Sequence, residues 1–527
     1  MYIHLRDHRR WVLPEVLAFQ AARIPDAVYI QTTDGEHLTY GAANDDAHRV
    51  AGALASLGVG PGDRVAMMLP NNLDFVRLWL GVGRLGATLV PLNVALTGSF
   101  LEHPLRNSEA RVVVVDQAFR STVEAACHDN QLIVDPAALR DGAPWSGPLP
   151  RASDLACILY TSGTTGPSKG VLMPHAHCYL FGLGTVDSQQ LTSDDRYYVV
   201  LPLFHVNGLM MQLYATLIAG ASAVLRPKLS AGAFVDDLHR YGITATGLLG
   251  AAAAFIIAQP PRPEDRGHRL RIIQTAPNPA EHMQQWKERF GVAEVLSGFG
   301  MTEVNIPIYG RMGKTRPNTS GMVYDRYFEV EIRDPDTDDL MPDGEIGEIM
   351  VRPKVPFGFM TGYNGMPEAT VAAWRNFWFH TGDAGVRDVE GYFTYVDRIK
   401  DCIRRRGENI SSFEVEEAMK RLSGVHEVAA FAIPSEIAGA EDEVMLAVVP
   451  TANSGLTVVQ IAEHAAHHLP RFAQPRYIEL MSELPKTPTE KIRKQSLRRR
   501  GLTPATIDLA ANDMAEDLAA KNSSASA

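Results

Sequence analysis

The chain has 527 residues, of which 46% are hydrophobic and 21% are charged, and its net charge is −11. Because one hydrophobic core stops growing at roughly 250–300 residues, this length predicts two or more domains, and the composition is that of a soluble globular protein. The acidic balance argues against a general nucleic-acid-binding protein. No stretch reaches 18 uncharged apolar residues and the start of the chain is polar, so we expect no membrane span and a cytoplasmic location.

Short runs rich in Val and Ile alternate with helical patterns from about residue 40 to residue 350. Apolar residues three and four apart predict helices over 42–57 and 72–85. The runs that we expect to form strands are 110–115, 155–160, 197–201, 270–274 and 329–333. This alternation predicts an α/β fold with a buried and partly parallel sheet.

A different pattern follows residue 397. Helical patterns at 414–422 and 457–468 enclose strand-like runs at 425–433 and 443–449, which together predict a compact α+β unit. We therefore expect a large, multilayered α/β domain and a small, mobile α+β domain, followed by a flexible tail rich in Ala, Asp and Ser. The expected bounds are 1–397, 398–505 and 506–527.

The most informative segment is Tyr160-Thr-Ser-Gly-Thr-Thr-Gly-Pro-Ser-Lys-Gly-Val171. Its glycines permit backbone conformations in which successive N–H groups converge on a phosphate, and Lys169 adds positive charge. It is not a Walker A loop, because Ser168 stands where that motif requires glycine. We expect a phosphate-binding loop that joins two strands, the alternative being an ordinary polar turn.

This segment resembles the signature of the adenylate-forming superfamily, which includes acyl-CoA synthetases, adenylation domains of peptide synthetases and beetle luciferases. Further motifs follow in the family's order from about residue 38 to residue 500, and Phe299 replaces the tyrosine that is usual in one of them. The C-terminal phrases are most similar to the crotonobetaine/carnitine-CoA ligase-like branch. The motifs are Leu201-Pro-Leu-Phe-His-Val-Asn-Gly208, Ser297-Gly-Phe-Gly-Met-Thr-Glu303, His380-Thr-Gly-Asp383, 391–410 and 485–493.

The resemblance implies an acid–thiol ligase that adenylates a small-molecule carboxylic acid with ATP and Mg2+ and then passes the acyl group to coenzyme A. Thr302 would donate to the α-phosphate, Glu303 would bind Mg2+, and Asp383 with Arg398 would contact the ribose. Lys491 would reach both the carboxylate and the α-phosphate, and Lys400 would be the hinge. The implied catalytic set is Lys491, Thr302, Glu303 and His205. The implied phosphate contacts are Thr161, Ser162, Gly163, Thr164, Thr165, Gly166 and Lys169.

The resemblance also implies an acid pocket and a thiol-binding face. The pocket positions are small or apolar and include neither Lys nor Arg, which favours a monocarboxylic acid with an apolar body. On the thiol side, an arginine suits a phosphate of coenzyme A, the alternative being a solvated basic strand edge. The pocket positions are His205, Val206, Asn207, Gly250, Gly300 and Met301. The thiol-side positions are Arg404, Arg405, Arg406 and Gly407.

Three alternatives stay open at this point. The acceptor could be a carrier protein rather than free coenzyme A, although the chain carries no phosphopantetheine site of its own. The chain could also be a weak acyl-adenylate-binding protein, with Phe299 and Glu490 as signs of decay. It could act as a monomer or a homodimer. A separate GxGxxG pattern at 81–86 follows a helical segment, so we interpret it as a closely packed helix end rather than a nucleotide site.

Overall fold

The computed structural model describes residues 7–161, 167–398, 402–405, 408–436, 441–486 and 492–510. The chain divides into two compact units. The first comprises Met1–Val94, Leu105–Tyr160 and Lys169–Ile399, and the second comprises Ala95–Pro104, Thr161–Ser168 and Lys400–Ala527. The second unit thus takes in two short segments of the N-terminal half. The domain bounds expected from the sequence stay a prediction.

One sheet of the first unit is parallel except at one edge. Its strands are β1 (Val28–Thr32), β2 (His37–Thr39), β9 (Arg196–Val199), β10 (Ser222–Leu225), β11 (Ala245–Leu249), β12 (Ile272–Ala276) and β13 (Glu294–Leu296). Their order is β13-β12-β11-β9-β10-β1-β2, and only the β1–β2 pair is antiparallel among the described strands. The strands expected at 197–201 and 270–274 are confirmed as β9 and β12.

A second sheet carries the glycine-rich segment. Its strands are β3 (Arg64–Met68), β4 (Thr88–Pro91), β5 (Val112–Val115), β6 (Leu132–Val134), β7 (Leu155–Thr161), β8 (Lys169–Pro174) and β19 (Gly362–Tyr363). Their order is β19-β8-β7-β4-β3-β5-β6. All four valines of β5 are buried, as expected for a strand covered on both faces. The segment after β7 therefore joins two neighbouring strands, as the sequence predicts.

The third sheet of this unit is antiparallel. Its strands are β14 (Gly298–Met301), β15 (Asn305–Tyr309), β16 (Gly321–Val323), β17 (Phe328–Arg333), β18 (Gly347–Pro353), β20 (Trp374–Arg375), β21 (Trp378–Arg387) and β22 (Tyr392–Arg398). The order is β14-β15-β16-β22-β21-β18-β17, with β20 paired to β21. The sheet therefore contains both the Thr302–Glu303 motif and the Asp383 motif.

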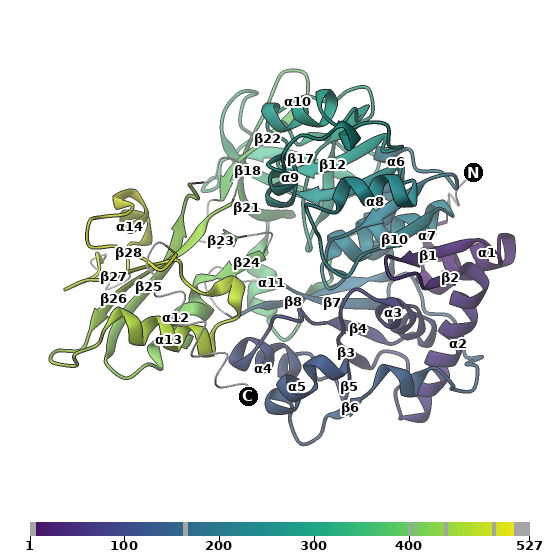
Figure 1. Ribbon diagram of the computed structural model, residues 1–527, viewed down its shortest axis with the longest axis horizontal. Helices are drawn as coiled ribbons and strands as arrows, with labels where there is room; N and C mark the ends of the chain where they lie inside the picture. The colour runs from purple at the N-terminus through teal and green to yellow at the C-terminus, as the bar shows by residue number, and fades with distance from the viewer. Residues whose placement is uncertain are drawn as a thin grey trace. The chain divides into compact units, whose positions relative to one another are not determined.

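Helices cover these sheets. The α-helices are α1 (Leu13–Arg23), α2 (Tyr40–Ser56), α3 (Leu73–Leu85), α4 (Gly98–Asn107), α5 (Arg120–Ala126), α6 (His175–Gln189), α7 (Ala215–Ala219), α8 (Phe234–Tyr241), α9 (Gly250–Ile257), α10 (Ala280–Glu288) and α11 (Pro367–Ala373). Short helices are η1 (His8–Arg10), η2 (Gln117–Phe119), η3 (Pro136–Leu139), the π-helix η4 (Asn207–Tyr214) and η5 (Pro263–Asp265). Figure 1 shows α8, α9 and α10 beside the first sheet, and a buried apolar cluster joins them to it.

The GxGxxG pattern at 81–86 is a closely packed helix end, which confirms its interpretation. It lies in the last turns of α3, and Gly86 follows the helix at φ 78°. A Cβ atom on Gly81 would clash with Val50 of α2, so the missing side chain lets the two helices approach each other.

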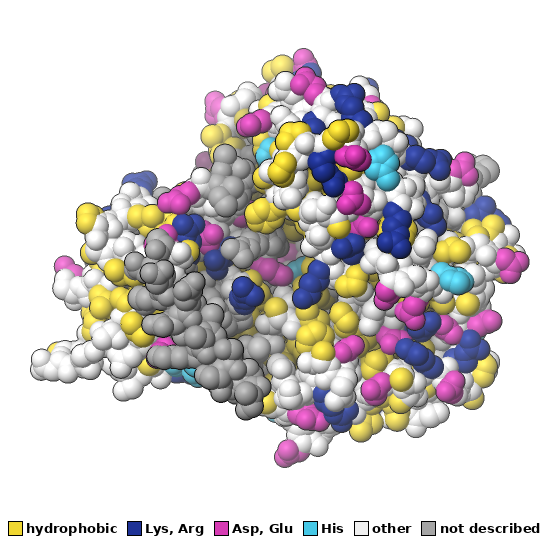
Figure 2. Space-filling view, in the orientation of Figure 1, with side chains coloured by type: hydrophobic (Ala, Val, Ile, Leu, Met, Phe, Trp, Pro, Cys, Tyr) yellow, Lys and Arg dark blue, Asp and Glu magenta, His cyan; other side chains and the backbone are white. Residues whose placement is uncertain are grey.

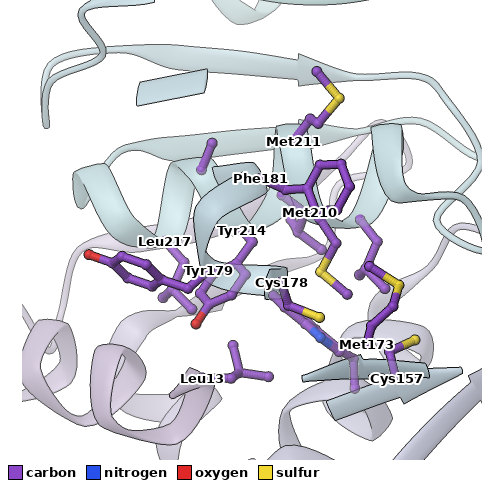
Figure 3. Close-up of a cluster of buried hydrophobic side chains, with 14 of the residues drawn as sticks. Leu13, Cys157, Met173, Cys178, Tyr179, Phe181, Met210, Met211, Tyr214 and Leu217 are labelled. Atoms are coloured by element: carbon purple, nitrogen blue, oxygen red, sulfur yellow. The ribbon is translucent and has the colours of Figure 1, made fainter. Parts of the chain in front are cut away.

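A cluster of buried aromatic and sulfur-containing side chains surrounds α6 in the first unit. Almost every residue of α6 is buried, which is typical of a helix covered on all sides. Figure 3 shows Cys178, Tyr179 and Phe181 of this helix together with Met210 and Tyr214 of η4. Cys157 and Cys178 are free and buried. Polar groups of α6 must therefore find partners inside the protein.

The α+β pattern predicted after residue 397 is confirmed. Its elements are β23 (Cys402–Arg405), β24 (Glu408–Ser411), α12 (Ser412–Lys420), β25 (Val425–Ile433), β26 (Glu443–Pro450), α13 (Val458–His468), η6 (Arg471–Ala473), β27 (Tyr477–Leu480), α14 (Lys494–Arg500) and β28 (Ile507–Asp508). β25, β26, β27 and β28 form one sheet. Separate apolar clusters lie against its two faces, one with α12 and α13 and one with α14.

Among the described helices, none combines the length and the apolar character that crossing a membrane requires. Figure 2 shows basic and acidic side chains interspersed over the visible face. The described residues of this face therefore carry both signs of charge, in a chain whose net charge is −11.

Candidate active site

The glycine-rich segment lies between the end of β7 at Thr161 and the start of β8 at Lys169. Its central positions, Ser162, Gly163, Thr164, Thr165 and Gly166, lie outside the described residues. The Lys169 ammonium lies 4.8 Å from the centroid of the Tyr363 ring. At this distance a cation is attracted to the face of an aromatic ring. Tyr363 belongs to β19, which pairs with β8 so that Tyr363 stands opposite Val171.

Tyr363 also contacts the second predicted motif. Its hydroxyl donates to Glu303 Oε1 at 3.0 Å, and the Glu303 residue is 5% exposed. The amide N–H of Met360, three residues before Tyr363, donates to the Glu303 carbonyl oxygen at 3.1 Å. Tyr363 therefore joins Lys169 and Glu303, two residues 134 positions apart in the sequence. Tyr363 was not predicted from the sequence, because no charge or spacing singles it out.

Glu303 lies in the turn between β14 and β15. Met301 and Asn305 face each other across this hairpin, and Asn305 adopts a left-handed conformation at φ 73°. Asn tolerates this region better than other non-glycine residues because its short polar side chain bonds locally. Here Asn305 Oδ1 accepts from the Ile306 N–H at 2.9 Å. A Cβ atom on Gly300 would clash with the Asn305 carbonyl oxygen, which explains the glycine of the motif.

Asp383 lies on β21 of the same sheet and is 2% exposed. Its N–H donates to Thr381 Oγ1 at 3.1 Å, and the Gly382 N–H donates to the buried Glu348 carboxylate at 2.7 Å. Gly382 has φ 72°, so the Thr-Gly-Asp motif requires its glycine. In the β21–β22 ladder Asp383 pairs with Arg398, of which the structure describes the backbone. The two residues expected at the ribose are therefore backbone neighbours.

Three of the expected acid-pocket positions lie at the start of η4, and the others lie on β14 and at the end of β11. His205 and Val206 precede this π-helix and Asn207 begins it, and π-helices often occur at functional sites. The centroids of the Phe204 and His205 rings lie 4.6 Å apart. At the end of β11, a Cβ atom on Gly250 would lie 2.8 Å from Pro277 Cδ, so the backbone after β11 runs close to that after β12. Gly300 and Met301 belong to β14.

Uncharged amides that the sequence analysis did not single out lie beside these positions. Gln212 Nε2 donates to Asn207 Oδ1 and to the Gly247 carbonyl oxygen, each at 3.0 Å. Gln274 stands opposite Gly247 on β12, and its amide oxygen accepts from Gln189 Nε2 at 2.9 Å. Among the described residues, the buried Oε1 atoms of Gln189 and Gln212 have no hydrogen-bond partner. The region is thus polar and uncharged rather than only small and apolar.

Two thiol-side arginines differ in their partners. Arg405 pairs with Glu443 at 2.6 Å and donates to the carbonyl oxygen of Gln474 at 2.7 Å, and its side chain is 11% exposed. Arg404 pairs with Glu441 at 2.9 Å, but its side chain is 46% exposed. Arg405 therefore serves the packing of its own unit, and Arg404 is the better placed for a ligand. Arg406 and Gly407 lie outside the described residues, as do Lys400 and Lys491.

The arrangement suits a divalent cation that is held mainly by the phosphates of a bound nucleotide and only in small part by the protein. Within the described ranges, no group of three or more His, Cys, Asp or Glu side chains is placed to bind a metal ion. Mg2+ is typically held by one or two carboxylates together with phosphate oxygens and water. The buried Glu303 carboxylate, with Lys169 across the Tyr363 ring, fits a site for Mg2+ and a polyphosphate.

Comparison with known proteins gives matches over both parts of the chain. The family "AMP-binding enzyme" matches residues 17–364, and "AMP-binding enzyme C-terminal domain" matches residues 414–491. A sulfoacetate–CoA ligase of Cupriavidus necator is 32% identical over 504 residues, which cover 92% of this chain and 97% of the relative. A crotonobetaine/carnitine–CoA ligase of Salmonella paratyphi C is 32% identical over 499 residues, which cover 90% and 95%.

The fold is also that of a solved enzyme. The crystal structure of ATP-bound MatB from Rhodopseudomonas palustris matches with a TM-score of 0.68 and 28% identity, covering 92% of this chain and 98% of that one. The resemblance inferred from the motifs and the adenylate-forming fold are therefore confirmed. With a family match over most of its length and relatives that are 32% identical over at least 90% of it, this chain belongs to the AMP-binding enzyme family.

Proposed function

We propose that this chain is an ATP-dependent acyl-CoA ligase. It joins a carboxylate to the α-phosphorus of ATP with loss of pyrophosphate, and the thiol of coenzyme A then displaces AMP to form a thioester. The family match and the relatives named as CoA ligases support this function. The observation that carries it is the buried Glu303 carboxylate, bonded to Tyr363 and joined through that ring to Lys169.

Charge explains why these residues are needed. A carboxylate must approach a polyphosphate, and both are anions, so oriented donors and positive charge supply most of the catalysis. Mg2+, when bound with ATP, neutralises phosphate charge. We assign Glu303 to hold that ion and Thr302 to donate to the α-phosphate. We assign Lys169 with the 161–166 loop to the outer phosphates, Asp383 with Arg398 to the ribose, and Lys491 to the attacking carboxylate.

The small C-terminal region would act in both half-reactions, with Lys491 in the first and a thiol-binding face in the second. We keep residues 1–397 and 398–505 as the two functional domains of the chain, with Lys400 as the hinge between them. Arg404 is the described arginine that we assign to a phosphate of coenzyme A, because its guanidinium is half-exposed. Arg405 is not assigned this role, since its guanidinium is bonded to Glu443 and to backbone carbonyl groups.

The acid should carry a single negative charge. The described residues assigned to its pocket, from His205 to Asn207 and at Gly250, Gly300 and Met301, include no Lys or Arg that could pair with a second anionic group. Gln212 and Asn207 instead present uncharged polar atoms. A monocarboxylic acid with an aliphatic, alicyclic or aryl body fits this lining, and an uncharged polar substituent is compatible with it.

A substrate panel tests this function. The enzyme is incubated with ATP, Mg2+, coenzyme A and one acid at a time, and pyrophosphate release and thioester mass are both measured. Monocarboxylic acids should give acid-dependent pyrophosphate and the matching acyl-CoA. Pyrophosphate without a thioester would point to a carrier protein as acceptor, and a preference for dicarboxylic or sulfonated acids would contradict the proposed pocket. No acid-dependent pyrophosphate from any acid would contradict ligase activity itself.

A further inference from the structure

His177 is a buried histidine that no motif singled out. It is the third residue of α6, which begins directly after β8 and therefore directly after Lys169–Pro174. Its ring is fully buried and packs edge-on against Phe181, with the ring centroids 5.0 Å apart. Because α6 is covered on all sides, each ring nitrogen must find its partner within the protein.

The two nitrogens face two backbone carbonyl groups, and both carbonyls belong to segments that contact Glu303. Nε2 lies 2.8 Å from the Thr302 carbonyl oxygen, in the turn that contains Glu303. Nδ1 lies 2.8 Å from the carbonyl oxygen of Gly358. The Gly358 segment continues to Met360 and Tyr363, which bond to the Glu303 backbone and carboxylate. His177 thus lies between the two segments that enclose Glu303.

The ring has one proton to share between these carbonyl groups. Burial lowers the pKa of His177 to about 4, so the ring is neutral near pH 7 and carries a single N–H. Asn305 Nδ2 lies 3.3 Å from Nδ1 and also donates to the His177 carbonyl oxygen at 3.0 Å. This amide supplies the donor that an unprotonated Nδ1 needs. We therefore assign the proton to Nε2 and to the bond with Thr302, so the Nδ1 contact with the Gly358 carbonyl oxygen is not a hydrogen bond.

We propose that His177 is a positioning residue for adenylation: its Nε2–H holds the Thr302 carbonyl group and so orients the Thr302 hydroxyl and the Glu303 carboxylate toward ATP and Mg2+. This inference rests on the proposed function. His177 touches neither reactant in this account and acts only through the turn. A displacement of even 1 Å at a catalytic group costs on the order of 100-fold in rate, so loss of one turn contact has a measurable effect.

Three substitutions separate this role from simple packing. His177→Phe keeps an aromatic ring but removes both nitrogens. His177→Gln places an amide N–H about as far from the backbone as Nε2, toward Thr302, whereas His177→Asn places it about where Nδ1 lies, toward Gly358. Acid-dependent exchange of labelled pyrophosphate into ATP gives kcat together with the KM values for ATP and for the acid.

We expect His177→Phe to lower kcat/KM for ATP by roughly 10-fold while it changes KM for the acid by less than about 2-fold, since outer-shell partners of a metal site typically contribute 10–100-fold. His177→Gln should recover most of this loss and His177→Asn should not. The matched control is His175→Phe. His175 is also buried in the first turn of α6, but its Nδ1 accepts from the Leu13 N–H at 3.4 Å, so this variant should change stability and leave KM for ATP unaltered.

The outcomes are distinct. Equal recovery by His177→Gln and His177→Asn would overturn the inference, because it would show that filling the space suffices. So would a His177→Phe variant whose KM and kcat match the wild type, or whose losses match those of His175→Phe. If the wild type itself shows no acid-dependent exchange, the proposed function fails, and that result is separate from any difference among the variants.

Discussion

Two hairpin turns of the same antiparallel sheet hold non-glycine residues in the left-handed conformation, and they do so in opposite surroundings. In the β14–β15 turn, Asn305 at φ 73° is fully buried and bonded to His177 and Ile306. In the β20–β21 turn, Asn376 and Phe377 have φ 50° and 63°, and Phe377 is 85% exposed. Strain persists where surrounding bonds over-determine it, and such places are typically functional.

The partners of the two turns explain the difference. Buried groups hold the first turn from several sides: Tyr363 at the Glu303 carboxylate, Met360 at its carbonyl and His177 at Thr302. In the second turn the Asn376 amide bonds to Asp338, but the Phe377 side chain lies in solvent. We infer that the first turn is strained in order to position chemistry, whereas the strain at Phe377 brings no visible benefit.

The largest expected effect follows from Glu303→Gln. This change keeps the shape of the side chain but removes the charge assigned to Mg2+, so kcat for acyl-CoA formation should fall by about 100-fold, the scale of losing one electrostatic catalytic group. The control is Glu345→Gln, which removes a charge from an exposed position before β18. An unchanged rate in Glu303→Gln would show that the buried β14–β15 turn does not position a catalytic group.

Asn305 tests whether the buried turn depends on its strained residue. Asn305→Gly keeps the backbone conformation and loses the side-chain bonds to His177 and Ile306, which should lower the free energy of unfolding by about 1–2 kcal/mol. Asn305→Ala loses those bonds and adds left-handed strain, about 1–2 kcal/mol more. Urea unfolding measures both variants. Equal stability of the two would show that the conformation itself costs little there.

The order of elements and the motifs could be predicted from the sequence, and the contacts that support the motifs could not. Alternating runs identify β5 and β12 because buried strands need continuous apolar residues. Glu303 and Asp383 were predicted as site residues because they stand in motifs that resemble those of a known family. Tyr363 and His177 carry no such motif. Their proposed roles depend on where they lie in the fold, and in a sequence they look like any other buried tyrosine or histidine. The π-helix η4 likewise has no signal, because its hydrogen bonds differ from those of an α-helix and its composition does not.

Tyr363→Phe removes the hydroxyl group that donates to Glu303 and leaves the aromatic ring that contacts Lys169. Without the hydroxyl donor, the Glu303 carboxylate loses one orienting bond, and the Mg2+ concentration for half-maximal activity should rise by roughly 10-fold. Tyr392→Phe is the matched control, since Tyr392 lies on β22 of the antiparallel sheet and its hydroxyl donates to the Lys314 carbonyl oxygen at 3.2 Å. Equal Mg2+ dependence in both variants would argue against a positioning role for Tyr363.

Phe377→Gly should give the smallest effect, and it should stabilise the protein rather than weaken it. Two-residue hairpin turns with positive φ at both positions favour Asn-Gly, so glycine should relieve the strain at this exposed site and stabilise the protein by about 1 kcal/mol. Activity should stay at the wild-type level. Urea unfolding checks the gain, with Phe377→Ala as the control that removes the ring but keeps the Cβ atom. A loss of activity in Phe377→Gly would show that the exposed turn also serves function.

The most direct test of the account is acid-dependent exchange of labelled pyrophosphate into ATP by the wild-type enzyme without coenzyme A. Adenylation is reversible before the thiol enters, so the account predicts exchange that requires both the acid and Mg2+ and that stops when EDTA removes the metal. Exchange that proceeds without an acid, or no exchange with any acid that the enzyme binds, would contradict it.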